Sequence, residues 1–333
     1  MVQRKMAIPA AAVLALGAGA AAAHTLVSNW KKNPDPLGGE PLRFPEGLER
    51  AVQLPDGALI NTVTVGDGPT IVCVHGLTSN RNDWAPMAPT LLDAGFQLLA
   101  IDQRGHGGST SGAAGFGATQ LGDDLSVVFE ALDVHAVALM GHSMGGMASM
   151  SYAVHHPDAF HERVDALVLV ATAASLKTAR HRIGLLLGGY VIPEFFRPQN
   201  DRLRVTTGLS AFGARPSLHM IDQAIEQFRS CSEAVRAVAT GGLRDHDVHD
   251  LLDAIDVPTY VIGAERDQLI RPQQVRALAD GIDGAELEML DEAGHMLIWE
   301  RHTQVAELVS AWLDQRVAVG RPSSDAQPDQ DPT

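Results

Sequence analysis

Short apolar runs rich in β-branched residues recur along the chain, separated by longer segments whose apolar residues repeat with helical spacing. Several runs are apolar at consecutive positions, the pattern of strands buried on both faces of a parallel sheet. The pattern predicts strands at 71–74, 98–101, 137–140, 166–170, 259–262 and 287–290, and helices at 85–94, 119–132, 144–155, 272–281 and 303–316.

Strands that alternate with helices predict βαβ units, and therefore an α/β fold with a mostly parallel, doubly wound sheet and helices on both faces. Two earlier runs, at 51–54 and 58–65, are joined by Pro55-Asp56-Gly57. Proline followed by Asp-Gly suits a tight turn, so these runs are expected to form an antiparallel hairpin at the edge of the sheet.

The alternation stops between residues 171 and 256, a gap too long for a loop without structure. It contains LLLGGYVIPEFF at 185–196 and a helical pattern over 217–239. We therefore expect a largely helical cap, residues 172–255, inserted after the sixth strand. The sheet and its helices would then comprise residues 49–171 and 256–317.

The N-terminal segment has a different composition. Arg4 and Lys5 precede an uncharged run that reaches Ala23 and continues into small residues, which is the pattern of a secretory signal peptide. Residues 6–27, followed by Trp30, would also suit a membrane anchor, and a soluble alanine-rich helix is the third interpretation. We expect residues 1–30 to be a signal peptide or membrane anchor, 31–48 a linker, and the folded domain to lie outside the cytoplasm.

The net charge of the chain limits the classes of molecule that it is expected to bind. Its 333 residues carry a formal net charge of −15, so a nucleic acid is excluded as an expected partner because like charges repel. The last residues, 318–333, are rich in Pro, Asp, Gln and Ser and are expected to form a disordered tail. No phosphate-binding loop or dinucleotide fingerprint is present, and no cofactor is expected.

One turn carries the clearest chemistry. The stretch VALMGHSMGGMA, residues 137–148, takes an apolar strand directly into Gly141-His142-Ser143-Met144-Gly145 and then a helix. This is the G-x-S-x-G pattern in the strand–turn–helix context that exposes a nucleophilic serine. The helix N-terminus behind the serine favours developing negative charge. A glycine-rich helix start with no catalytic role is the alternative.

Three other segments end strands in the same way. The strand at 71–74 leads into HGLTS, the strand at 259–262 into GAERD with Asp267, and the strand at 287–290 into DEAGH with His295. Carboxyl ends of parallel strands meet at one edge of a sheet, so these groups should lie near Ser143. Glu265 competes with Asp267 as the acid of this group.

Together these motifs resemble the α/β-hydrolase fold family. The resemblance rests on HGLTS at 75, DQRGHGGS at 102, GHSMGG at 141, VPTYVIGAERD at 257 and GH at 294, and it covers residues 51–316. A serine as nucleophile departs from the haloalkane dehalogenases and epoxide hydrolases of that family, which use an aspartate.

The resemblance implies a role for each matching position. Ser143 would attack a carbonyl carbon, His295 would move the proton, and Asp267 would orient His295. The backbone N–H groups of Leu77 and Met144 would form the oxyanion hole. The family pattern favours Asp267 over Glu265.

Further residues are weaker candidates for substrate binding: His75, Gly76, Trp84, His142, Phe195 and Phe196. Each has a structural alternative, because Trp84 suits the core, His142 and His106 suit turn architecture, and cap aromatics pack a cap onto a sheet. The cluster DHDVHD at 245–250 could bind a metal, but the start of a solvated helix explains it equally well, and we expect no metal.

These features predict a cofactor-independent serine hydrolase whose substrate is a small carboxylic ester or a lipid-like molecule with an apolar part. A C–C bond hydrolase of the meta-cleavage type would keep the triad and use cap arginines such as Arg180, Arg182, Arg202 or Arg204. A perhydrolase or haloperoxidase, and a non-enzymatic binding protein with the same fold, are further alternatives.

Overall fold

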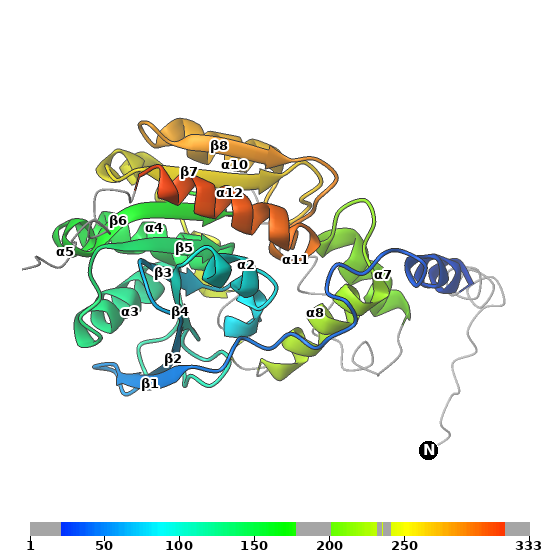
Figure 1. Ribbon diagram of the computed structural model, residues 1–333, viewed down its shortest axis with the longest axis horizontal. Helices are drawn as coiled ribbons and strands as arrows, with labels where there is room; N and C mark the ends of the chain where they lie inside the picture. Colours follow the sequence, from blue (N-terminus) through cyan, green and yellow to red (C-terminus); the bar gives the residue numbers. More distant parts are fainter. Residues whose placement is uncertain (1–20, 178–200, 232–234, 236–240, 317–333) are drawn as a thin grey trace, which may run out of the picture.

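The computed structural model describes residues 21–177, 201–231, 235 and 241–316. Within these, eight strands form one sheet in the order β1-β2-β4-β3-β5-β6-β7-β8 (Figure 1). The strands are β1 Leu48–Gln53, β2 Leu59–Val65, β3 Thr70–Val74, β4 Gln97–Ile101, β5 Val137–His142, β6 Val164–Val170, β7 Thr259–Ala264 and β8 Glu286–Leu290.

The pairing confirms the mostly parallel sheet. Strands β3 to β8 pair in parallel, whereas β1 pairs antiparallel with β2, and β2 antiparallel with β4. The Pro55-Asp56-Gly57 turn joins β1 to β2, with the Leu54 amide donating to the Ala58 carbonyl at 2.8 Å. The expected edge hairpin is therefore present.

Helices cover both faces of the sheet and bury two separate clusters of apolar side chains. In β3, Val72 and Val74 point into one cluster and Ile71 and Cys73 into the other, because successive side chains of a strand alternate between faces. The first cluster packs under α3 (Ala118–Ala131), α4 (Met144–His155), α5 (Pro157–Arg163) and α10 (Pro272–Gly281), and the second under α2 (Ala88–Asp93), α11 (Leu297–Glu300) and α12 (His302–Asp314).

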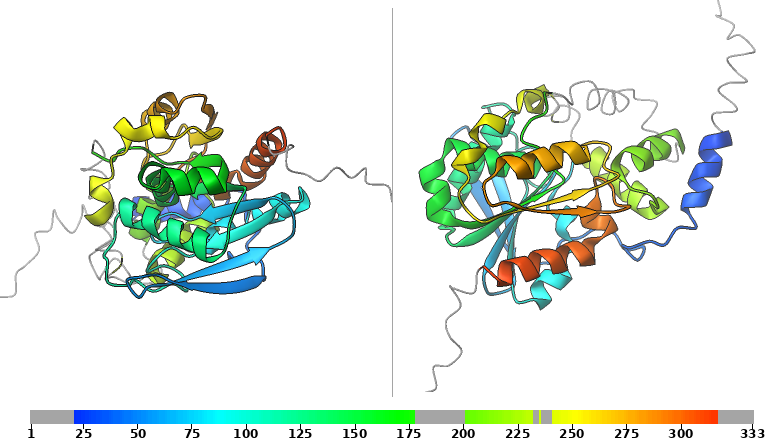
Figure 2. Two further views of the ribbon diagram at one scale, coloured as in Figure 1. Left: turned by 90° about the vertical axis from the view of Figure 1, so that its left-hand side faces the viewer. Right: turned by 90° about the horizontal axis from the view of Figure 1, so that it is seen from above.

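A helical cap follows β6, as expected. Its described helices are α7 (Asp201–Ala211) and α8 (Leu218–Ser230), which lie beyond one end of the sheet (Figure 2). The Ser217 hydroxyl caps α8 by accepting from the Met220 amide at 3.0 Å. The chain then returns to β7 through two short 3₁₀ helices, η3 (Leu243–Asp245) and η4 (His249–Ala254).

The segment before β1 packs against this cap. Residues 21–30 are helical, and Val27 and Trp30 are buried in the same apolar cluster as α7 and α8. Asn33 donates to the Pro216 carbonyl at 2.7 Å, and Asp35 accepts from the Ser217 hydroxyl at 2.8 Å. Residues 31–48, expected as a linker, thus make specific contacts with the cap.

The expected membrane anchor lies partly outside the described residues, which begin at residue 21. Among the helices that the structure does describe, none combines the length and apolar character needed to cross a bilayer. The expected C-terminal tail, 318–333, also falls outside the described residues.

Candidate active site

Ser143 occupies a sharp turn between β5 and α4. Its backbone has φ 52° and ψ −115°, in the positive-φ region that is costly for any residue other than glycine. Two hydrogen bonds hold the turn: the Ser143 amide donates to the Val170 carbonyl at 2.9 Å, and the Thr172 hydroxyl donates to the Ser143 carbonyl at 2.7 Å. The neighbouring strand β6 therefore fixes the strained conformation.

Gly145 permits this turn because the backbone of β3 passes very close to it. A Cβ atom at position 145 would lie 2.0 Å from the Val74 carbonyl oxygen, a distance that no side chain can occupy. The absence of a side chain lets the first turn of α4 press against the end of β3. As a result, the serine turn and the His75-Gly76 segment meet at one edge of the sheet.

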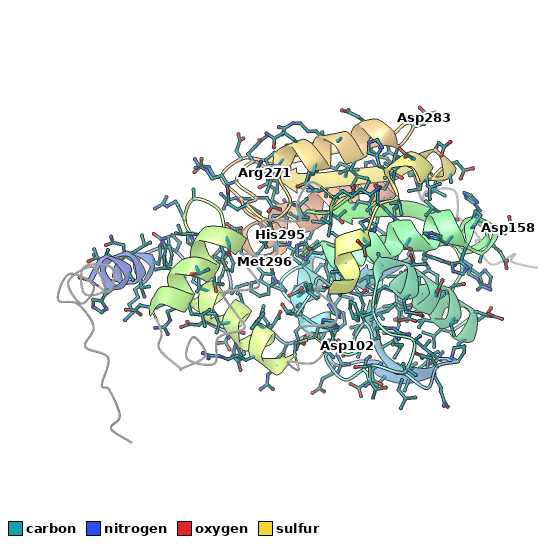
Figure 3. All side chains as sticks on the ribbon, turned by 180° about the vertical axis from the view of Figure 1, so that it is seen from behind. Asp102, Asp158, Arg271, Asp283, His295 and Met296 are labelled. Carbon is teal, nitrogen blue, oxygen red and sulfur yellow. The ribbon has the colours of Figure 1, made fainter. Side chains whose placement is uncertain are left out.

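His295 and Asp267 complete a hydrogen-bonded relay with the serine. His295 Nε2 lies 3.0 Å from Ser143 Oγ, and His295 Nδ1 lies 2.8 Å from Asp267 Oδ2. His295 follows β8 and is placed at the end of the sheet that faces the cap helices, whereas Asp158 and Asp283 lie at the opposite end (Figure 3). The structure thus brings together all three residues that the resemblance selected.

The Asp267 carboxylate is itself held in place. Its Oδ1 accepts from the Leu269 and Ile270 amides at 2.8 and 2.9 Å, which leaves Oδ2 directed at the imidazole. The side chain is almost fully buried. Its competitor Glu265 instead forms a partly exposed ion pair with Arg276. The geometry therefore favours Asp267 as the partner of the histidine.

The expected oxyanion segments also flank the serine. A Cβ atom at Gly76 would lie 3.4 Å from Ser143 Cβ, so the segment that contains Leu77 passes directly beside the serine. Met144 is the first residue of α4, where the backbone N–H groups have no partner within the helix. Thr78, which follows Leu77, has φ 62°, and its amide donates to His106 Nε2 at 3.2 Å.

Comparison with known proteins decides the family. The model of the alpha/beta hydrolase fold matches residues 69–302 of the chain. The protein belongs to the α/β-hydrolase fold family. It is 25% identical over 249 residues to the AB hydrolase superfamily protein YisY of Bacillus subtilis, a match that covers 74% of this chain and 92% of that protein.

Two solved structures share the fold of this α/β hydrolase. An esterase from Exiguobacterium antarcticum superposes with a TM-score of 0.72 at 22% identity and covers 80% of this chain and 100% of its own. A structure described as a membrane phospholipase A, a bacterial virulence factor, superposes with a TM-score of 0.68 at 20% identity and covers 92% of this chain and 97% of its own.

Three buried histidines of the hydrolase support the turns around the serine. His75 Nε2 accepts from the Gln103 amide at 3.0 Å, His106 accepts from Thr78, and His142 Nε2 lies 3.0 Å from the His295 carbonyl oxygen. Burial lowers the pKa of His75 to about 4 and those of His106 and His142 to about 3. They are therefore neutral near pH 7 and act as hydrogen-bonding parts of the backbone framework.

These histidines should make the fold sensitive to acid. With His246, whose pKa burial lowers to about 4, four histidines bind protons below about pH 6.5 only when the chain unfolds. Two buried carboxyls act in the opposite sense. Burial raises the pKa values of Asp83 and Glu300 to about 7, so below that pH they bind protons in the folded state. Unfolding therefore takes up about two protons in total. The free energy of unfolding should fall by about 2–3 kcal/mol per pH unit as the pH drops from 6 to 5.

Urea unfolding followed by circular dichroism at pH 7, 6 and 5 measures this slope. A midpoint that stays constant or rises as the pH falls from 6.5 to 5 would contradict it. The same series with His246→Gln supplies a control away from the serine, since His246 Nε2 contacts the Ala173 carbonyl at 3.1 Å. That variant should show a shallower slope.

The remaining candidates occupy other positions. Trp84 ends η1 (Arg81–Trp84) and is buried in the apolar cluster beneath α2 and α11, while Phe195 and Phe196 lie outside the described residues. His246 is buried and His249 is exposed, and the described part of the chain contains no cluster of side chains suited to a metal ion. Among the cap arginines, Arg204 donates two hydrogen bonds to the Asp222 carboxylate, from Nε at 2.7 Å and from Nη2 at 2.9 Å.

Two buried carboxyls near the relay were not anticipated from the sequence. Burial raises the pKa of Asp83, and hydrogen bonds with Ser79, Gln227 of α8 and the Gly76 amide oppose that rise. Glu300 accepts from the Gly294 amide, next to His295. Each lies in a helix of four residues. Such short elements carry no periodicity that would mark a carboxyl as buried, so no sequence signal distinguished them from surface acids.

Proposed function

We propose that this α/β hydrolase is a serine esterase that cleaves carboxylic esters with an apolar acyl or alcohol part. The observation that carries the proposal is the relay from Ser143 Oγ to His295 Nε2 at 3.0 Å and from His295 Nδ1 to Asp267 Oδ2 at 2.8 Å. Its nucleophile sits on a strained turn at a helix N-terminus. This combination matches the requirements of acyl transfer.

In the proposed mechanism, Ser143 Oγ attacks the ester carbonyl while His295 Nε2 takes the hydroxyl proton. The negative oxygen of the tetrahedral intermediate accepts from the Leu77 and Met144 N–H groups. His295 then gives the proton to the departing alcohol, leaving an acyl-serine. Water activated by His295 attacks this ester, and the carboxylic acid leaves as the serine regains its proton.

The apolar character of the substrate is inferred from the cap. Helix α8 contributes Met220, Ile221, Ile225 and Phe228, all buried, to the apolar cluster that also contains Trp30 and residues of α11. An apolar cap over the serine favours an apolar substrate. Proteins of the same fold include one named an esterase and one named a membrane phospholipase A, which supports an ester or a lipid as the substrate class.

A series of p-nitrophenyl esters from acetate to palmitate tests this proposal. The protein should begin at residue 21 rather than 31, because Val27 and Trp30 pack into the cap. We expect hydrolysis with an optimum chain length, and labelling of Ser143 by a fluorophosphonate. If the serine is labelled but no ester of the series is hydrolysed, the ester assignment fails and a C–C bond hydrolase becomes the next candidate. Absence of labelling in folded protein would contradict an activated serine.

We propose further that the folded domain acts outside the cytoplasm, exported or anchored by the N-terminal segment. The basic residues Arg4 and Lys5 and the uncharged run up to Ala23 support export. Mass determination of the N-terminus after expression in a bacterial host, with fractionation of the membrane, distinguishes a cleaved segment from an anchor. Full-length protein confined to the soluble cytoplasmic fraction would overturn this proposal.

A further inference from the structure

Glu300 is a buried carboxyl that joins the histidine loop to the cap. It ends α11 and its side chain is largely shielded from solvent. Its Oε1 accepts from the Gly294 amide at 2.9 Å, and its Oε2 accepts from the Gly213 amide at 2.8 Å. Gly213 lies two residues after the end of α7 at Ala211, so one carboxylate binds two loops that are far apart in the sequence.

The two loops cross with their backbones almost in contact. The Ala214 amide donates to the Glu292 carbonyl and the Met296 amide to the Ala211 carbonyl, each at 2.9 Å. A Cβ atom at Gly213 would lie 2.0 Å from the Glu292 carbonyl oxygen, and one at Gly294 would lie 2.3 Å from the Phe212 carbonyl carbon. Glycine is therefore needed at both positions, and Glu300 accepts from the amide of each.

This crossing holds the backbone on both sides of the catalytic imidazole. Glu300 binds the amide of Gly294 before His295, the cap loop binds the amide of Met296 after it, and His142 contacts the carbonyl of His295 itself at 3.0 Å. Asp267 contacts the imidazole of His295 and not its backbone. A shift of this loop would move Nε2 away from Ser143, and displacements of about 1 Å can reduce rates by about 100-fold.

We propose that Glu300 is a positioning residue for the hydrolytic reaction, which in its ionised form locks the His295 loop to the cap. The inference rests on the proposed function, since it assigns a role in that same relay. Glu300 touches neither the serine nor the reacting atoms. It acts through the Gly294 and Gly213 amides. A carboxylate accepts hydrogen bonds from these N–H groups more strongly than a neutral carboxylic acid does.

The charges around Glu300 give this lock a pH dependence. Burial raises the pKa of Glu300 and Asp267 adds to the rise, while the two amides and Arg301 oppose it; the resulting pKa is about 7. Arg215 and Glu292 also border the same small pocket at the surface. Above pH 7 the carboxylate accepts both amides, whereas below it one oxygen carries a proton and the lock weakens.

The decisive variant is Glu300→Gln, which keeps the shape but presents an NH₂ group to one of the two amides. We expect kcat/KM on the preferred p-nitrophenyl ester to fall by about 10- to 100-fold at pH 8.5, mostly in kcat. The difference from wild type should shrink toward pH 5.5, where Glu300 is already protonated. Glu307→Gln is the control, because it removes an exposed carboxyl of α12 outside the two crossing loops, and it should stay within about twofold of wild type.

The experiment distinguishes failure of the Glu300 proposal from failure of the proposed esterase function. If wild-type Ser143 is not labelled by a fluorophosphonate, the proposed function itself fails. If it is labelled and Glu300→Gln has the wild-type kcat and pH profile per labelled serine, only the role of Glu300 is overturned, even where the melting temperature falls. Should the variant not fold, the wild-type profile decides. Protonation of Glu300 must then lower kcat/KM by about a further 10- to 100-fold between pH 8.5 and 5.5, and a profile that a single ionisation describes overturns the proposal.

Discussion

Replacing Ser143 by alanine should reduce ester hydrolysis by about 10⁴-fold or more, because the variant has no atom that can form the acyl-enzyme. The change removes only Oγ, whose contact is His295 Nε2 at 3.0 Å. The backbone hydrogen bonds of the turn, to Val170 and from Thr172, do not depend on it. The melting temperature should therefore change little, and the loss of rate can be assigned to chemistry.

The measurement is kcat/KM on the preferred p-nitrophenyl ester, together with fluorophosphonate labelling. Ser149→Ala is the matched control, since Ser149 is a buried serine of the same helix whose hydroxyl donates to the Gly145 carbonyl at 2.8 Å. It should retain activity within a few-fold and should still be labelled. Full turnover by Ser143→Ala would refute the serine mechanism.

Replacing Asp267 by asparagine should lower kcat by about 10³- to 10⁴-fold. The carboxylate accepts from His295 Nδ1 and from the Leu269 and Ile270 amides. An asparagine can satisfy the two amides with its oxygen only by turning its NH₂ group toward Nδ1. The imidazole then adopts the tautomer with its proton on Nε2 and cannot accept the serine proton.

This prediction separates Asp267 from the acid that competes with it in the sequence. Glu265→Gln removes a charge two residues away, in a partly exposed pair with Arg276, and should leave kcat within about twofold of wild type. Steady-state kinetics at pH 8 compare the two variants. A large loss for Glu265→Gln with a small one for Asp267→Asn would reverse the assignment.

The sheet could be predicted from the sequence because buried strands carry their signal locally. The helices expected at 144–155 and 272–281 coincide with α4 and α10. The helix α5, Pro157–Arg163, was not predicted because its seven residues, which begin with the proline, make less than two full helical turns of periodicity. The order of the strands, in which β4 lies between β2 and β3, and their register needed the structure.

The packing of the N-terminal segment could not be predicted in the same way. Charge and hydropathy separate residues 31–48 from the sheet, and a polar segment between an apolar run and a domain suggests a linker. Its contacts with Pro216 and Ser217 involve residues about 180 positions away. Hydrogen bonds between residues so far apart in the sequence do not change the pattern of apolar positions in either segment.

By itself, the sequence predicted the α/β class, the cap after the sixth strand, and Ser143 and His295 as candidate catalytic residues, because strand periodicity and glycine-bounded turns are local properties of the chain. The resemblance to the family favoured Asp267 over Glu265 as the acid. Only the tertiary structure decided that Asp267 rather than Glu265 faces the imidazole, that four histidines are buried and neutral, and that Glu300 joins the histidine loop to the cap. The reason is physical: burial and the distance between groups set pKa values and hydrogen bonds, and both arise from segments that meet only when the chain has folded.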